Sequence, residues 1–274
     1  MPDKIEPIGS TLKTDKNGFL IKEANKENIK GKWKEAVDHL IDSCKKHLRE
    51  KNLHSIWIRG SVAKGIAKEN LSKEDSSDID SIILTNCETK EIGKNRLEEI
   101  SKELSEKFPF IEKVELPVKN YKEILEKEKY KHWRFMLKHL SVCVYGEDIS
   151  KKFENFKPDK ELAKIMSIDL EEIIKKARKK ISEHPEKAKR WCKWVMNKIV
   201  RQGFLLVLEK EKTFTRDLYP CYNLFSKHYP KKEPEMKEAL NLAIYPTNDK
   251  EKIYRIFDNL GSFLIEETNR LDLN

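Results

Sequence analysis

The pattern of apolar residues changes near residue 156, and this change limits the possible folds more than any other feature of the chain. Before it, short runs rich in β-branched residues predict strands between amphipathic helices, for example 55–59 (SIWIR) and 79–85 (IDSIILT). After it, apolar residues recur at three- and four-residue intervals between breaks marked by Pro, Asn and Asp, a pattern typical of helices. We therefore expect an α+β domain followed by an all-α helical domain.

The expected domains are residues 1–155 and 156–274, with 1–24 as a polar N-terminal arm or an early turn. The first domain is expected to hold a small mixed β-sheet flanked by helices. Its strands are expected at 55–59, 79–85, 110–118 and 141–149, and its helices at 27–50, 89–107 and 121–140. The second domain is expected to hold helices at 160–183, 186–210, 219–229, 233–244 and 249–270.

Cysteine usage and hydropathy exclude several classes of protein. The five cysteines are odd in number and form no C-x-x-C pair, so neither a disulfide framework nor a zinc site is indicated. The N-terminal region lacks an apolar stretch of the kind found in signal peptides, and no segment approaches the roughly 18 apolar residues of a membrane span. A soluble, cytoplasmic protein is expected.

The chain is basic, with 56 lysines and arginines against 47 acidic residues and a formal net charge of +9. Such an excess fits an anionic partner, either nucleic acid or nucleotide phosphates. It fits equally well a lysine-rich surface of solvated helix faces. The charge alone does not decide between these interpretations.

Asp78 and Asp80 open the expected strand 79–85. Side chains two residues apart on a strand point to the same face, so the two carboxylates would stand side by side while Ile79 faces the core. Adjacent carboxylates repel each other, and a divalent cation relieves that repulsion. Magnesium, which prefers hard oxygen ligands, is the expected cation.

A second short motif, Gly60-Ser61, follows the expected strand 55–59 and leads to Lys64. Glycine allows the backbone to approach an anion closely, and N–H and hydroxyl groups can donate hydrogen bonds to it. The motif is therefore a candidate phosphate site, with Lys64 as a further contact. Each motif is common by itself and is a weak signal of function. Their combination in this order along the chain is a more specific signal.

The ordered set of strand, Gly60-Ser61, the Asp78-x-Asp80 pair and a third acidic residue in a later strand resembles the nucleotidyltransferase superfamily, which includes DNA polymerase β and the aminoglycoside adenylyltransferases. Glu115 fits the third place because its neighbours are apolar, whereas Glu112, the competing candidate, is followed by a lysine. On one continuous strand the two glutamates would face opposite ways.

The resemblance implies that Asp78, Asp80 and Glu115 are the catalytic residues and hold two magnesium ions. Glu115 would ligate a metal ion, act as general base, or do both. Gly60, Ser61 and Lys64 would contact the phosphates of a nucleoside triphosphate, with ATP as the expected co-substrate.

Several positions depart from the family pattern. The stretch 69–75 is an additional charged segment that suggests a flap, and Ser81 stands where an apolar residue is usual. Lys64 replaces an arginine, so it would contact phosphate as a point charge. Arg59, at the end of the expected strand, is expected to point into solvent, as strand-end arginines usually do, with a contact to the phosphate site as the alternative.

The expected function is magnesium-dependent transfer of a nucleoside monophosphate, with AMP as the expected group, to a hydroxyl of a small molecule such as an aminoglycoside-type antibiotic. The helical second domain is similar to the layout of the aminoglycoside adenylyltransferases. Two alternatives stay open: an RNA, tRNA or protein acceptor, and a non-catalytic nucleotide-binding module. No membrane partner is expected, and the oligomeric state is not predicted.

Overall fold

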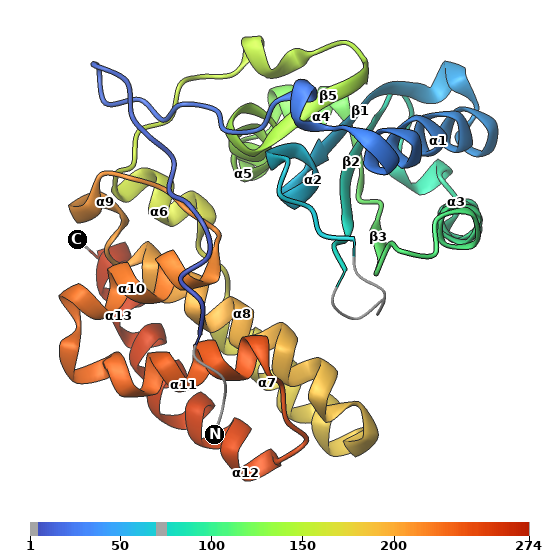
Figure 1. Cartoon of the computed structure of the whole chain (residues 1–274). Helices are drawn as coiled ribbons and strands as arrows, with labels where there is room; N and C mark the ends of the chain where they lie inside the picture. Colours follow the sequence, from blue (N-terminus) through green and yellow to red (C-terminus); the bar gives the residue numbers. More distant parts are fainter. Residues whose placement is uncertain (1–4, 70–75, 274) are drawn as a thin grey trace. The chain divides into compact units, whose positions relative to one another are not determined.

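The computed structural model describes residues 5–69 and 76–273, which form two compact units (Figure 1). One unit is Ile21–Asn155, and the other combines the described residues before Ile21 with those from Phe156 onward. Most of the expected flap, 70–75, and the first four residues of the expected arm lie outside the described residues.

A five-stranded mixed sheet forms the centre of the Ile21–Asn155 unit among its described residues, in the order β3-β2-β1-β5, with β4 also paired to β2. The strands are β1 (Leu53–Arg59), β2 (Ile79–Thr85), β3 (Val114–Glu115), β4 (Val118–Asn120) and β5 (Ser141–Gly146). β1 pairs antiparallel with β2 and β5, whereas β3 and β4 run parallel to β2. The expected α+β class with a small mixed sheet is confirmed. The single strand expected at 110–118 is instead two short strands that flank Pro117, because proline cannot continue the ladder.

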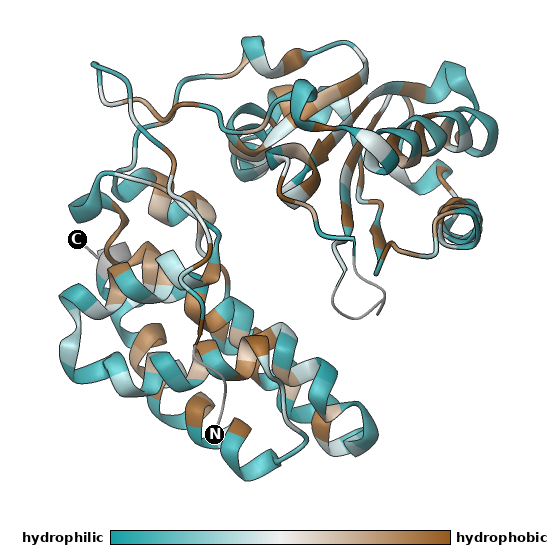
Figure 2. Cartoon of the chain, viewed as in Figure 1, coloured by the Kyte–Doolittle hydropathy of each residue, from teal (hydrophilic) through white to brown (hydrophobic). Residues whose placement is uncertain are grey.

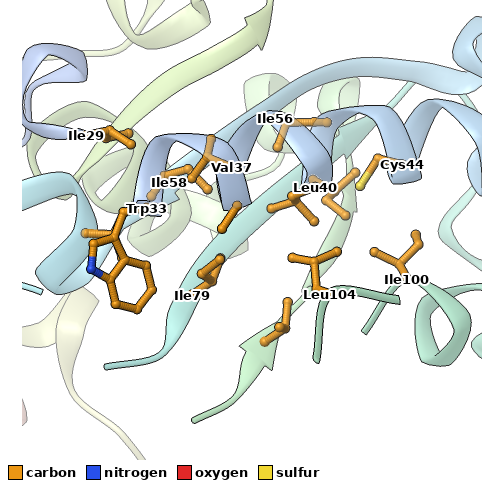
Figure 3. Packing of buried hydrophobic residues seen from close by; sticks show 14 of the residues in the cluster. Ile29, Trp33, Val37, Leu40, Cys44, Ile56, Ile58, Ile79, Ile100 and Leu104 are labelled. Atoms are coloured by element: carbon orange, nitrogen blue, oxygen red, sulfur yellow. The ribbon is translucent and has the colours of Figure 1, made fainter. Parts of the chain in front are cut away.

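Helices α1 (Gly31–Leu48) and α3 (Lys94–Lys107) cover one face of this sheet, and the short helix α2 (Gly60–Lys64) directly follows β1 (Figure 1). The apolar residues of α1 recur at helical spacing and are buried against the strands. Figure 3 shows this packing for Ile29, Trp33, Val37, Leu40, Cys44, Ile56, Ile58, Ile79, Ile100 and Leu104. Their burial fixes which residues of β1 and β2 face α1 and α3, and therefore which alternate residues face the other side of the sheet.

Helices α4 (Tyr121–Glu126) and α5 (Lys131–Phe135) and the π-helical turn Met136–Leu140 contribute to a second apolar cluster around Trp57 on the other face. The continuous helix expected at 121–140 is wrong. The chain becomes extended at Lys127, and the buried Arg134 donates hydrogen bonds to the backbone oxygens of Ile124 and Lys127 that the break exposes.

The described part of the other unit is mainly helical. Its helices are α6 (Lys160–Met166), α7 (Leu170–Glu183), α8 (Ala188–Leu205), α9 (Leu208–Glu211), α10 (Leu218–His228), α11 (Glu233–Ile244), α12 (Lys250–Ile256) and α13 (Ser262–Leu273). Hydrophilic and hydrophobic residues alternate around these helices in Figure 2, as the sequence pattern predicts. The N-terminal segment packs with them, since Leu12 forms a β-bridge with Phe214 and accepts a hydrogen bond from Thr213 Oγ1 at 2.6 Å.

None of the helices in the described ranges is long and apolar enough to span a membrane. All five cysteines are free thiols.

His139 provides a test of this fold through the pH dependence of its stability. The imidazole is buried, with 3% of the residue exposed, and burial together with the charges of Lys138 and Lys22 lowers its pKa from 6.5 to about 4. The unfolded chain therefore binds a proton at a higher pH than the folded chain does, and the stabilising contribution is lost as the pH falls from 6.5 towards 4. We expect His139→Gln to remove a slope worth on the order of 2–3 kcal/mol over that window.

The measurement is urea denaturation of both proteins at several pH values between 4.5 and 7.5. All other titratable residues are common to the two proteins, so the difference in slope isolates His139. Parallel curves for the wild type and His139→Gln would contradict the prediction.

Candidate active site

Three side chains from neighbouring strands meet at one end of the sheet. Arg59, the last residue of β1, lies opposite Asp80 in the antiparallel pair β1–β2. Asp80 in turn lies opposite Glu115 in the parallel pair β2–β3. Because directly opposed residues project to the same face, the guanidinium and the two carboxylates gather on one side of the sheet.

The start of β2 places the two aspartates on that same side. Ile79 is fully buried in the cluster beneath α1, so alternation directs Asp78 and Asp80 to the opposite face. The chain entering β2 is fastened by Ser76, whose hydroxyl donates a hydrogen bond to the backbone oxygen of Lys68 at 2.9 Å. The sequence-predicted juxtaposition of the aspartates therefore follows from the burial of one isoleucine.

Ser81 anchors the third carboxylate. Its side chain is fully buried, and its hydroxyl donates a hydrogen bond to the backbone oxygen of Glu115 at 2.6 Å. This bond links β2 to β3, a strand of only two residues. An apolar residue could not make it, which gives a physical reason for the polar residue at this position.

Arg59 joins two of the carboxylates through a single nitrogen. Its Nη2 lies 2.7 Å from Asp80 Oδ1 and 3.0 Å from Glu115 Oε2, and only 18% of the side chain is exposed. The expectation that Arg59 points into solvent is wrong, because cross-strand register places it beside two carboxylates. Lys113 Nζ pairs with the other oxygen of Glu115 at 2.6 Å.

Asp78 carries a charge that the cluster compensates poorly. Its Oδ1 is buried and has no hydrogen-bond partner. Burial, followed by the negative charges of Glu112 and Asp80, raises the pKa of Asp78 to about 6. The charge of Glu112 therefore acts on Asp78 as well. Glu112 lies outside β3, so strand alternation does not place it on the face opposite to Glu115.

Glu115 differs from Asp78 in its protonation behaviour. Burial would raise the pKa of Glu115, but the hydrogen bond from Lys113 and the charge of Arg59 outweigh it and lower that pKa. One carboxylate is therefore held firmly as an anion while its neighbour is pushed towards the neutral form. This contrast within one cluster is typical of functional sites.

Gly60 forms the turn that brings α2 next to the carboxylates. Its φ is +70°, a conformation that favours glycine, and a Cβ placed here would lie 2.4 Å from Asp80 Oδ2. The absence of a side chain is therefore required both by the backbone and by the neighbouring carboxylate. Ser61, the next residue, is partly exposed in the single turn of α2.

Lys64 lies at the end of α2 and pairs with Glu23, with 2.9 Å between Lys64 Nζ and Glu23 Oε2. The structure thus gives the lysine an acidic partner that motif reasoning did not identify. Glu23 lies in a polar segment without pattern, and no sequence signal marked it.

Among the described residues, no group of three or more His, Cys, Asp or Glu side chains forms a ready-made metal centre. The position of Arg59 gives a physical reason, because its Nη2 lies between the oxygens of Asp80 and Glu115. The donor set nevertheless fits magnesium, which prefers carboxylate oxygens, and the buried, unpartnered Oδ1 of Asp78 is an oxygen that a cation would satisfy.

The sequence predicted the carboxylates but not their pairing with Arg59 and Lys113. Lys113 and Glu115 are two residues apart, and strand alternation would have placed them on one face. The pairing of Arg59 depends on the register of three strands, for which the sequence contains no direct signal.

Comparison with solved structures shows a similar fold in the spectinomycin adenyltransferase AAD(9) from Enterococcus faecialis, whose crystal structure contains ATP and spectinomycin. The TM-score is 0.52 and the sequence identity 16%, and the alignment covers 87% of this chain and 99% of the neighbour. At this identity the likeness concerns the fold. No protein-family profile and no curated protein sequence matches the chain.

Proposed function

We propose that this protein is a magnesium-dependent nucleotidyltransferase that moves AMP from ATP to a hydroxyl group of a small molecule. The observation that carries the proposal is the convergence of Asp78, Asp80 and Glu115 at the strand ends, where one buried carboxylate oxygen has no partner. A cluster with surplus negative charge next to a glycine turn suits a cation and the phosphates it accompanies.

The fold likeness to an adenyltransferase bound to ATP and spectinomycin supports both halves of the proposal. It favours ATP as the nucleotide and a hydroxyl-bearing antibiotic of the aminoglycoside or spectinomycin type as the acceptor. The acceptor class rests on this likeness alone, so the experiment below compares it with other acceptors.

In the proposed reaction the acceptor oxygen bonds to the α-phosphorus of ATP, the bond to the β-phosphate oxygen breaks, and pyrophosphate leaves. Asp78, Asp80 and Glu115 would hold Mg²⁺, which when bound stabilises negative charge on the attacking and leaving oxygens. The lowered pKa of Glu115 keeps its carboxylate ionised and able to accept the proton of the acceptor hydroxyl.

The phosphates would lie against the turn after β1. Gly60 leaves room at this turn, and the Ser61 hydroxyl and backbone N–H groups would donate hydrogen bonds to phosphate oxygens. Lys64 would exchange Glu23 for the triphosphate, and so bring one positive charge to the leaving group.

The proposal is tested by incubating the protein with each α-labelled nucleoside triphosphate, Mg²⁺ and one acceptor class at a time. The classes are an aminoglycoside panel that includes spectinomycin, total RNA and lysate protein. We expect label from ATP to appear on one of the small molecules, with a mass increase of one AMP residue. Absence of label on every acceptor, with nucleotide binding retained, would leave a binding module and contradict the proposal.

The net charge of +9 keeps an RNA acceptor as the alternative. Label on RNA rather than on a small molecule would replace the proposed acceptor while keeping the chemistry. RNA binding would then weaken steeply with added salt, because it depends on phosphate contacts.

Gly60→Ala tests the glycine turn. The new methyl group would overlap Asp80 Oδ2, and an alanine at φ +70° is strained, so the carboxylate must move. We expect transfer to fall about a hundredfold, as misplacement of a reacting group by about 1 Å allows. The cost in stability should be only about 1–2 kcal/mol.

Gly93→Ala is the matched control, because Gly93 has open space around a Cβ position and no positive φ. Transfer rates measured with saturating substrate, together with thermal unfolding, separate the loss of activity from the loss of stability. Equal transfer rates in the wild type and Gly60→Ala would contradict the role of this turn.

A further inference from the structure

Arg59 lies against Asp80 and Glu115, two of the carboxylates that would hold the proposed metal. We propose that Arg59 is a built-in competitor of the metal: its guanidinium neutralises these carboxylates in the metal-free protein and must leave them when a divalent cation binds. The inference rests on the proposed function, since it assumes that the two carboxylates are metal ligands.

The competition follows from which oxygens are already engaged. Arg59 Nη2 contacts Asp80 Oδ1 and Glu115 Oε2, and Lys113 takes Glu115 Oε1. The second oxygen of Asp80, Oδ2, faces Gly60. A cation held by Asp80 and Glu115 would compete with the Arg59 guanidinium for these carboxylates, because two positive centres repel at short separation.

The contacts of Arg59 are incomplete, which favours a residue that can move. Its Nε is buried and has no hydrogen-bond partner. A buried donor without an acceptor is uncommon in folded proteins and needs a reason. The attraction of two carboxylates for Nη2 provides that reason, because it positions the guanidinium at the expense of a partner for Nε.

Apart from Asp80 and Glu115, no side chain among the described residues is seen to pair with the Arg59 guanidinium. Ser141 lies opposite it in β5, but the Ser141 hydroxyl donates to the backbone oxygen of Met136 at 2.9 Å. Only the carboxylates therefore hold the guanidinium among the contacts described for it. If a cation took these carboxylates, the guanidinium would lose the contacts that hold it there.

The inference predicts a specific order of metal affinities. If Arg59 closes the site for part of the time, the apparent affinity of the wild type is reduced by the fraction of molecules in which the site is open. We expect Arg59→Met to bind Mn²⁺ about tenfold more tightly than the wild type. Arg59→Lys, which keeps the charge but loses the planar fork, should lie between the two.

Lys113→Met is the matched control, because it also removes one positive charge from Glu115 but leaves the position between the carboxylates unchanged. Mn²⁺ binding to the four proteins is measured by electron paramagnetic resonance without nucleotide, and metal-induced shifts in thermal unfolding are measured with Mg²⁺. We expect Arg59→Met to unfold at a lower temperature than the wild type without metal, and to gain more from Mg²⁺.

Three results would overturn the inference. Equal affinities of the wild type and Arg59→Met, with AMP transfer intact, would contradict the competition and leave the proposed function standing. An equal gain in affinity for Lys113→Met and Arg59→Met would show a general charge effect and no displacement. Absence of Mn²⁺ binding in every protein would instead remove the metal site, and with it both the inference and the proposed function.

Discussion

Asp80→Asn is expected to lower the rate of AMP transfer by about a thousandfold, equivalent to about 4 kcal/mol of transition-state stabilisation. Asp80 is the central member of the cluster, since strand register places it between Arg59 of β1 and Glu115 of β3. Asparagine keeps the shape and removes the charge that the proposed metal needs. The loss should therefore appear in kcat and not through misfolding.

The measurement is single-turnover transfer with ATP and the acceptor identified by the labelling experiment. Asp38→Asn is the control, because Asp38 makes only a surface pair with Lys34 in α1, and the same chemical change there should leave the rate unaltered. Circular dichroism and thermal unfolding show whether Asp80→Asn remains folded. Full transfer by a folded Asp80→Asn protein would rule out the proposed mechanism.

The parts of the fold that the sequence predicted well are those governed by local pattern. β2 runs from Ile79 to Thr85 as its β-branched residues predict, and α1 follows its helical periodicity. The carboxylate pair of the site was predictable for the same reason, because alternation around one buried residue, Ile79, is a local property.

The parts that were not predictable depend on particular side-chain and strand pairings that local periodicity does not encode. Arg134 stabilises a break in the expected helix 121–140 by binding backbone oxygens of the preceding turn. The N-terminal segment packs on Phe214, about two hundred residues away in the chain. Arg59 is the clearest case in the site, because its partners are set by the register of three strands. Propensity and periodicity contain no information on such pairings.

Asp78→Asn is expected to abolish transfer and, in contrast to most active-site substitutions, to stabilise the metal-free protein. Burial and the charges of Glu112 and Asp80 make the ionised Asp78 unfavourable, as its pKa of about 6 reflects. Near pH 7.5 the wild type is therefore folded with a carboxylate that its surroundings disfavour. A neutral amide removes that repulsion, and we expect a gain on the order of 1–2 kcal/mol once solvent screening is allowed for.

The difference in stability between Asp78→Asn and the wild type should reverse in sign when Mg²⁺ is added. The proposed Mg²⁺ would bind the folded wild type through the charge of Asp78, so Mg²⁺ should raise the unfolding temperature of the wild type more than that of Asp78→Asn. Urea denaturation at pH 7.5, with and without Mg²⁺, measures both differences, and Asp38→Asn again serves as the control. A metal-free Asp78→Asn protein less stable than the wild type would contradict the argument. A more stable but inactive Asp78→Asn protein would show that the fold tolerates the unfavourable charge of Asp78 because the reaction uses it.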